Sequence, residues 1–175
     1  EGYTAEEVAN DFILGFNENE NEIGSGVPYM EDLYTPTKYN SEDGKTVLDL
    51  EDDAAHVNMG GDWHMPTPEQ IDELLGNTTY TWTTKNGIDG VLFTASNGNS
   101  LFVPIAGGAS YGGVTAIGVI CFVWSSSVYE AGSRENALGL GLQDGDARIG
   151  PIFRAFGFTM RGVVGYKNSN NNMPV

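Results

Sequence analysis

The chain has 175 residues and a net charge of −16, from 24 acidic and eight basic side chains. That length fits one domain, which can bury a sizeable apolar core without disulfide or metal cross-links. The charge argues against binding a nucleic-acid backbone or an anionic membrane, because both require clustered Lys and Arg.

Charge and glycine divide the chain into two unlike parts. Residues 1–75 carry 19 acidic and two basic side chains, whereas residues 76–175 carry five acidic and six basic ones. Glycine is biased the other way, with seven before residue 76 and 17 from there on. We therefore expect an acidic, solvated first part and a near-neutral, turn-rich sheet in the second.

The N-terminal part predicts short elements separated by loops. Thr4 and Glu7 fit a capping box for a helix over residues 5–11, and an apolar run predicts a strand over 11–16. Residues 17–22 alternate Asn and Glu, which indicates an exposed loop. Calcium binding there is the alternative, although the spacing of a calcium loop is missing.

Two helices are predicted before residue 77. The first covers residues 48–58 and ends at Gly60-Gly61, with Asp49, Glu51, Asp52 and Asp53 in its first turn, where the helix dipole favours acids. The second begins after Thr67 as N-cap, with Pro68 at its first position and Gln70 closing a capping box. Its buried stripe is Ile71, Leu74 and Leu75, and it ends at Gly76.

Short strands follow from residue 80 onward. We predict strands over 80–84, 91–95 and 101–104, joined by turns at Asn86-Gly87 and 97–99. A glycine-rich excursion over 107–118 leads to a core strand over 119–128. Strands over 137–142 and 147–152 flank a turn at 143–146, and a strand over 156–164 completes the set. Helices followed by strands indicate an α+β domain.

The residues that could carry chemistry compose no active site. His56 and His64 have no Cys or second His at a metal-ligand spacing, so no metal site is predicted. Ser125-Ser126-Ser127 lies inside a strand and is better explained by hydrogen bonds to neighbours than as a nucleophile. Cys121, the single cysteine, sits in an apolar run and is predicted to be buried. Residues 144–146, Asp-Gly-Asp, are interpreted as a hairpin turn, with a metal site as the less favoured alternative.

No apolar run reaches the length of a membrane span, and no signal peptide is visible. Because the chain starts at Glu1 rather than Met, we expect it to be a piece of a larger polypeptide.

A set of ordered motifs carries a family resemblance, the most specific being residues 60–69, Gly-Gly-Asp-Trp-His-Met-Pro-Thr-Pro-Glu. The others are residues 43–48, 50–55, 81–87, 97–104, 124–127 and 157–161. Together they resemble the Fibrobacter major paralogous domain family over residues 39–164. The resemblance implies a C-type lectin-like fold of the formylglycine-generating-enzyme type, with two helices flanking a glycine-rich antiparallel sheet whose last strands present a ligand face. Residues 1–38 are left as an unassigned N-terminal segment, with packing on the domain as one option. Residues 39–166 are the predicted C-type lectin-like domain, and 167–175 a mobile tail.

The resemblance does not imply enzyme activity, and because the residues compose no active site, we expect a binding domain that is not an enzyme and has no cofactor. Formylglycine-generating enzymes work with a pair of cysteines, and this chain has one. It also lacks the Glu-Pro-Asn or Gln-Pro-Asp triplet through which sugar-binding C-type lectins hold calcium. Calcium-dependent sugar binding through that motif is therefore not expected.

The C-terminal segment over 136–163 is similar to the variable region of proteins targeted by diversity-generating retroelements. Scaffold-like positions there are Asn136, Ala137, Leu140, Leu142, Gly145, Ile149, Arg154, Gly157, Phe158 and Arg161. The expected ligand-binding positions are Gly139, Gly141, Asp144, Asp146, Arg148, Gly150, Pro151, Ile152, Phe153, Ala155 and Phe156. Each of these residue types is reachable from an AAC codon by changing one or both of its adenines, which are the bases that such retroelements randomise.

The expected function is ligand binding by a receptor- or adhesin-type domain on a bacterial cell or phage surface, with a protein or glycan on a cell surface as ligand. Phe153, Phe156, Arg148 and Asp146 would supply aromatic and charged anchors. One alternative is that Ile152, Phe153 and Phe156 are simply core of the last hairpin. The other is a structural module, such as a pilus-tip or virion decoration domain, whose lectin-like face packs on a neighbour.

Overall fold

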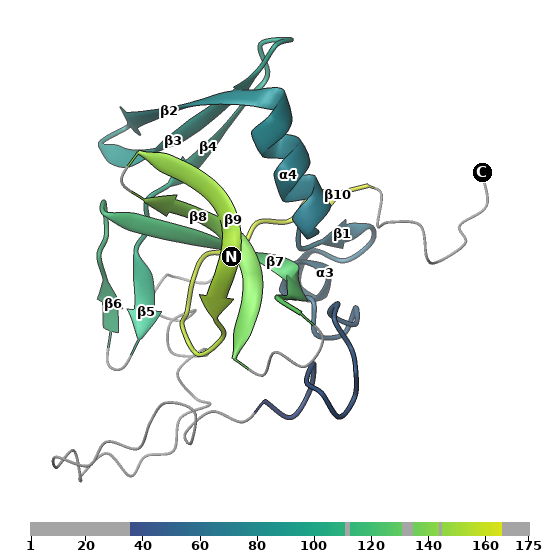
Figure 1. Cartoon of the computed structure of the whole chain (residues 1–175). Helices are drawn as coiled ribbons and strands as arrows, with labels where there is room; N and C mark the ends of the chain where they lie inside the picture. Colours follow the sequence, from purple (N-terminus) through teal and green to yellow (C-terminus); the bar gives the residue numbers. More distant parts are fainter. Residues whose placement is uncertain (1–35, 111–112, 131–134, 144, 166–175) are drawn as a thin grey trace, which may run out of the picture.

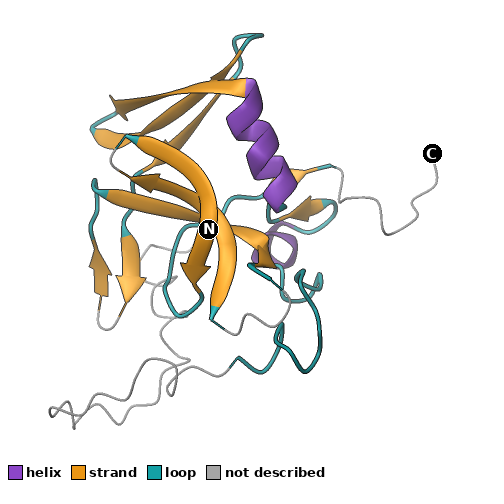
Figure 2. Cartoon of the chain, viewed as in Figure 1, coloured by secondary structure: helices purple, strands orange, loops and turns teal. Residues whose placement is uncertain are grey.

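A computed structural model describes residues 36–110, 113–130, 135–143 and 145–165 as small antiparallel sheets with few helices (Figure 1). The α+β class is confirmed. The helices are α3 (Ala54–Met59) and α4 (Pro68–Asn77), which lie along one side of the strands in Figure 2. The strands are β1 (Trp63–His64), β2 (Thr78–Lys85), β3 (Ile88–Ala95), β4 (Ser100–Pro104), β5 (Gly108–Ser110), β6 (Gly113–Thr115), β7 (Ile120–Val128), β8 (Asn136–Gln143), β9 (Asp146–Phe153) and β10 (Val163–Val164). The elements predicted over 5–11, 11–16, 17–22 and 167–175 lie outside the described residues.

Helix α4 forms as its sequence predicts. The Thr67 hydroxyl accepts from the Gln70 N–H at 3.3 Å, and the Gln70 side chain accepts from the Thr67 N–H at 2.9 Å. This reciprocal box satisfies two backbone donors that the helix start would otherwise leave unpaired. Ile71 is buried and Leu74 and Leu75 are half-buried, so the predicted stripe faces the core.

Strands β2, β3 and β4 form a meander of consecutive antiparallel neighbours. Asn86 and Gly87 have φ angles of 54° and 80°. Two positive φ angles define a type I′ turn, whose twist matches that of the flanking strands. The predicted turn at 97–99 is also present, since the Asn97 side chain accepts from the Asn99 N–H at 2.9 Å.

The sheet β7–β8–β9 separates two apolar clusters. Its first face packs against α4 and the β3–β4 strands, and its second face packs against α3 and the chain after β9. The first cluster is Ile71, Val91, Phe93, Val103, Ile105, Cys121, Val123, Leu140 and Leu142. The second is Ala55, Met65, Trp124 and Ile152, with Phe122, Phe158 and others packed against it. Cys121 is buried, as predicted.

The Leu-Gly alternation of β8 has a packing reason. Leu140 and Leu142 face the first cluster, so Gly139 and Gly141 lie on the other face of the sheet. A Cβ atom on Gly139 would lie 2.4 Å from the Ile152 Cδ1 atom, and one on Gly141 would lie 3.0 Å from the Phe122 ring. The glycines therefore let Ile152 and Phe122 lie directly over β8.

The helix predicted over 48–58 is shorter than expected. Residues 48–53 are outside it, and α3 begins at Ala54 with Asp53 as its N-cap. The carboxylate of Asp53 is fully buried and accepts from the N–H groups of Ala55, His56 and Met65, each at 3.0 Å. No acid occupies the first turn of α3, so that expectation was wrong.

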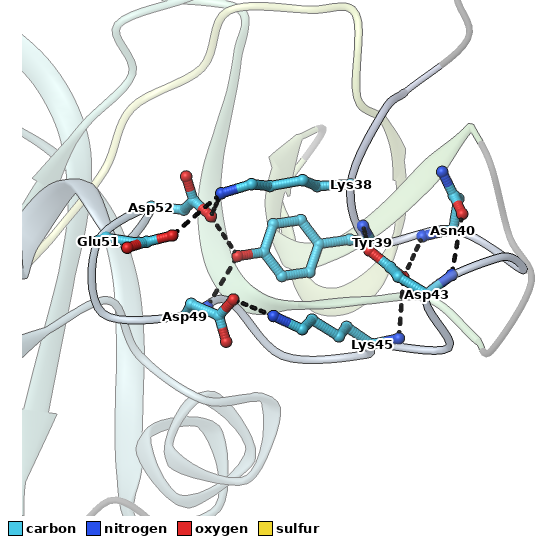
Figure 3. A network of polar contacts seen from close by, with 8 residues as sticks. All are labelled: Lys38, Tyr39, Asn40, Asp43, Lys45, Asp49, Glu51 and Asp52. Carbon is cyan, nitrogen blue, oxygen red and sulfur yellow. Dashed lines mark hydrogen bonds and ion pairs between the residues drawn. The ribbon is translucent and has the colours of Figure 1, made fainter.

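A polar network holds the acids before α3 in a turn (Figure 3). The Tyr39 hydroxyl donates to Asp52 at 2.5 Å and accepts from the Asp49 N–H at 2.9 Å. Lys38 pairs with Asp52 at 2.7 Å, and Lys45 pairs with Asp49. These side chains come from the preceding segment, so a helical pattern read from residues 48–58 alone does not detect them.

The strand predicted over 156–164 is also wrong in most of its length. Gly157 bridges to Ala109, Thr159 bridges to Val123, and only β10 pairs as a strand, with β1. The expected excursion over 107–118 contains the hairpin β5–β6. The segment over 156–164 differs because it pairs with chain far away in sequence, which leaves no local periodicity, whereas β5–β6 is a local hairpin whose three-residue strands are too short to show one.

Candidate ligand-binding site

An open cavity of about 320 Å³ lies where the C-terminal end of β9 meets β5 and β7. Its lining is almost entirely apolar and includes four phenylalanine rings. The lining residues are Gly108, Ala109, Ile120, Phe122, Pro151, Ile152, Phe153, Phe156 and Phe158. This volume is at the lower end of the range for small-molecule pockets, and it suits one bulky apolar group.

The backbone after β9 is held across the ends of two strands, which fixes the aromatic side chains. The Phe156 N–H donates to the Phe153 carbonyl at 3.2 Å, closing a turn. Gly157 and Ala109 exchange two backbone bonds of 2.7 and 2.8 Å. Thr159 accepts from the Trp124 N–H at 3.1 Å and donates to the Phe122 carbonyl at 3.2 Å. The cavity wall is therefore anchored to both β5 and β7.

The phenylalanines form one connected series of rings. The centroid distances are 5.7 Å for Phe153–Phe156, 5.9 Å for Phe156–Phe158 and 4.7 Å for Phe158–Phe122. All three pairs are tilted or edge-on, the arrangements that aromatic quadrupoles favour. The series runs from Phe122, which packs against the second core cluster, to Phe153 and Phe156, and all of these rings are half-buried.

Arg154 joins this site to the start of the described chain. Its guanidinium donates to the backbone carbonyls of Tyr39 at 2.9 Å and Lys38 at 3.1 Å. Its own N–H donates to the Glu135 carbonyl at 2.7 Å. The predicted scaffold role of Arg154 thus has a geometric basis, and Lys38, placed before the predicted domain boundary, contacts the domain.

The structure brings together four of the predicted binding residues, namely Pro151, Ile152, Phe153 and Phe156. Ile152 is only 6% exposed and also belongs to the second core cluster, so the core alternative describes it better. Phe153 and Phe156 are half-buried and line the cavity.

The other described positions of the predicted set are not among the lining residues of the cavity. Asp146 and Arg148 form an exposed ion pair of 3.6 Å, and Ala155 is half-buried. Gly150 has open space where a Cβ atom would be, whereas Gly139 is buried beneath Ile152 and Gly141 is packed against Phe122. Gly139 and Gly141 therefore serve the packing of the sheet and are not surface positions that a ligand would contact. Asp144 lies outside the described residues.

Sequence reasoning missed five lining residues, Gly108, Ala109, Ile120, Phe122 and Phe158. Phe122 and Phe158 stand in segments that read as core strands, and residues 108–109 stand in a segment without periodicity. Only their pairing with the chain after β9 brings them to the site.

Two other features, a second cavity and a group of carboxylates, are weaker candidates for a binding site. A cavity of about 350 Å³ beneath α4 is floored by core residues such as Ile71, Val103 and Leu140. The carboxylates of Asp49, Glu51 and Asp52 lie close enough to share a metal ion, but each is already paired with Lys38 or Lys45. Hydrogen bonds from Lys38 and Tyr39 hold the pKa of Asp52 below its ordinary value.

His64 and Ser125 have structural contacts, whereas the Ser126 hydroxyl is buried without a hydrogen-bond partner among the described residues, which differs from the expectation for the serine run. His64 is buried, with Nδ1 2.7 Å from the Met65 carbonyl and Nε2 2.6 Å from the Gly165 carbonyl. Ser125 donates to the Leu138 carbonyl of the neighbouring strand at 2.7 Å, as expected of a strand hydroxyl. Neither cavity described above has a histidine in its lining.

Among the described residues, no helix has the length and apolar character to cross a membrane. No family model, no curated protein and no solved structure matches the chain.

Proposed function

We propose that this protein is a non-catalytic ligand-binding domain that holds an apolar side chain of a protein ligand in the phenylalanine cavity. The observation that carries the proposal is the opening of this cavity among Phe153, Phe156 and Phe158, in the segment that resembles a variable region. An accessible aromatic surface marks contact sites more often than inert surface. The C-type lectin-like fold and the family resemblance of residues 39–164 are part of the same proposal.

A protein ligand is favoured over a glycan by the chemistry of the lining. None of the described lining residues carries a polar side chain. Sugars need several hydrogen-bonding partners, whereas an aromatic or aliphatic side chain gains mainly by leaving water. The exposed Asp146–Arg148 pair, at the start of β9 and outside the cavity lining, would affect specificity through surface charge more than affinity in the cavity.

A peptide library displayed on phage tests the proposal. Peptides selected on the protein should be enriched in aromatic or branched aliphatic residues. Their affinity should fall at least about tenfold for Phe156→Ser, because a central apolar contact is lost. Ile117→Ser is the matched control, since Ile117 is 69% exposed and outside the cavity lining. Equal loss in both variants, or no loss in either, would contradict the proposal.

A structural module remains the second candidate, because Phe153 and Phe156 are only half-exposed and would suit burial against a neighbouring domain. If the protein is a structural module, the phage library should yield no enriched peptides, and the phenylalanines should always contact the same surface of one neighbouring domain. Diversification makes a separate genetic prediction. The encoding DNA should have a near-identical repeat nearby, differing only where the template has adenine, and a reverse-transcriptase gene. A locus without a repeat would exclude diversification and leave the binding proposal intact.

The proposed place of action is the outside of a bacterial cell or of a phage particle, as the resemblance implies. Binding to the intact surface of host cells, compared with Phe156→Ser, would test this.

A further inference from the structure

Among the described strands, β2 is an edge strand of its sheet. It pairs with β3 on one side, and no described strand pairs with its other side. Its eight residues keep one register with β3 throughout, without proline or bulge, and Lys85 is its only charged residue. Most proteins block such an edge with charges, prolines or bulges, because its free N–H and C=O groups recruit another strand.

The neighbouring strands show which β2 groups point outward. The Asp89 carbonyl accepts from the Ile105 N–H at 2.8 Å, and the Ala95 N–H donates to the Asn99 carbonyl at 2.9 Å. The backbone N–H and C=O groups of odd-numbered residues in β3 therefore point toward β4, and those of even-numbered residues point toward β2, because the direction of these groups alternates along a strand. The register pairs these even residues with odd residues of β2, such as Leu92 with Thr81.

It follows that Tyr80, Trp82 and Thr84 turn their backbone groups away from β3, toward the open edge. A second copy of β2 running antiparallel, with Thr81 on the two-fold axis, would place Tyr80 opposite Trp82 of that copy. Each outward-facing residue would then meet another outward-facing residue. If the two strands were shifted by one residue, the free N–H and C=O groups of one copy would lie opposite groups of the other copy that already bond to β3. Symmetric pairing is therefore possible only when the two-fold axis passes through a residue, not between two residues.

The side chains also suit self-pairing. Tyr80 is 37% exposed, and its ring centroid lies 5.9 Å from that of Phe93, on the core side of the sheet. Trp82 packs against the same core cluster, and its indole N–H is buried without a partner among the described residues. In the symmetric register, Tyr80 and Trp82 of the two copies form cross-strand aromatic pairs, which stabilise antiparallel sheets.

Charge favours this edge over other surfaces. Two copies of a chain with net charge −16 repel each other, and β2 contains no acidic residue. The exposed side of β2 presents Thr79, Thr81 and Thr83 instead. When two copies approach each other at β2, no acidic side chain of one strand lies against an acidic side chain of the other.

We propose that two copies of this protein associate through their β2 strands, antiparallel and symmetric about Thr81, to form one six-stranded sheet. Figure 1 shows β2 at the far end of the domain from β5 and from the C-terminal end of β9, so both phenylalanine cavities stay uncovered. Such a pair would present two ligand sites and raise the avidity for a surface that carries many ligands.

Sedimentation velocity of the full chain, from about 1 µM to about 1 mM, tests the pairing over the range expected for a small interface. The wild type should shift from monomer to dimer. Thr81→Glu should weaken association at least about tenfold, because Thr81 faces Thr81 of the second copy and like charges would be opposed. Thr81→Lys should do the same, and an equimolar mixture of the two variants should dimerise again. This pattern is expected when Thr81 lies close to Thr81 of the second copy, as it does on the two-fold axis.

Ser100→Glu is the matched control, because Ser100 is exposed on β4, at the other edge of the same sheet. It should dimerise like the wild type. Circular dichroism and thermal unfolding of each variant establish that the fold is retained. A wild type that stays monomeric at the highest concentration overturns the proposal, as does a Thr81→Glu variant that dimerises normally or a mixture that fails to recover. A monomer whose β2 amides are protected only by an added peptide would instead identify a foreign strand as the occupant.

Discussion

The guanidinium of Arg154 donates to the backbone carbonyl of Tyr39 at 2.9 Å, across 115 residues of chain. The contact places the first described turn beside the phenylalanine cavity, because Arg154 follows Phe153 directly. The contact also joins the acidic first part of the chain to the near-neutral second part, because a basic residue of the second part binds the backbone of the first.

Replacing Arg154 should loosen both regions. Arg154→Ala removes two charge-assisted bonds to the carbonyls of Tyr39 and Lys38, and we expect a loss of about 1–3 kcal/mol in the free energy of unfolding. Arg148→Ala should cost less than about 1 kcal/mol, because its ion pair with Asp146 is exposed. Urea unfolding measures both. Equal stability of the two variants would show that the Arg154 contacts contribute nothing.

The glycines of the last hairpin should respond in opposite ways. Gly139→Ala should destabilise the protein by about 1–3 kcal/mol, because its Cβ atom would overlap Ile152 and the Val123 carbonyl. Gly150→Ala should be neutral or stabilising by up to about 1 kcal/mol, because its Cβ atom meets open space. Thermal unfolding distinguishes them. A Gly139→Ala variant as stable as Gly150→Ala would mean that the strand shifts to make room.

Asp53 should be the most sensitive acid before α4. Asp53→Ala leaves the buried N–H groups of Ala55, His56 and Met65 without their acceptor, and about 2–4 kcal/mol should be lost. Asp53→Asn keeps one acceptor oxygen and should lose less. Asp62→Ala, at an exposed position, should change stability by less than about 0.5 kcal/mol. Chemical unfolding of the three variants provides the ranking, and a ranking with Asp62→Ala lowest in stability would refute it.

Tyr39 predicts an alkaline loss of stability. Burial, together with the hydrogen bond to Asp52, raises the pKa of its hydroxyl from 10.0 to about 12. Because the folded state holds the proton more tightly, the contribution is complete below pH 10 and disappears as the pH rises toward 12. Absorbance at 295 nm should show a late-titrating tyrosine that is absent in Tyr39→Phe. A wild-type titration in which every tyrosine ionises near its ordinary pKa would contradict this burial.

The sequence by itself determined the elements whose signals are local. The Thr67–Gln70 capping box, the Asn86-Gly87 turn and the alternation in β2 to β4 depend on residues within one turn or one hairpin, so their positions could be predicted. The approximate limits of β7, β8 and β9 could be predicted as well, because apolar side chains or Leu-Gly alternation mark them.

Only the tertiary structure decided where the helix before Gly60 begins, what residues 156–164 do and which residues line the cavity. Lys38 and Tyr39 hold Asp52 in a turn, and Gly157 pairs with Ala109 in a segment without periodicity. Such contacts join residues far apart in the chain, and their free energy outweighs weak local preferences. The sequence therefore indicated Phe153 and Phe156 as binding residues, but Phe122 and Phe158 joined them only through the folded chain.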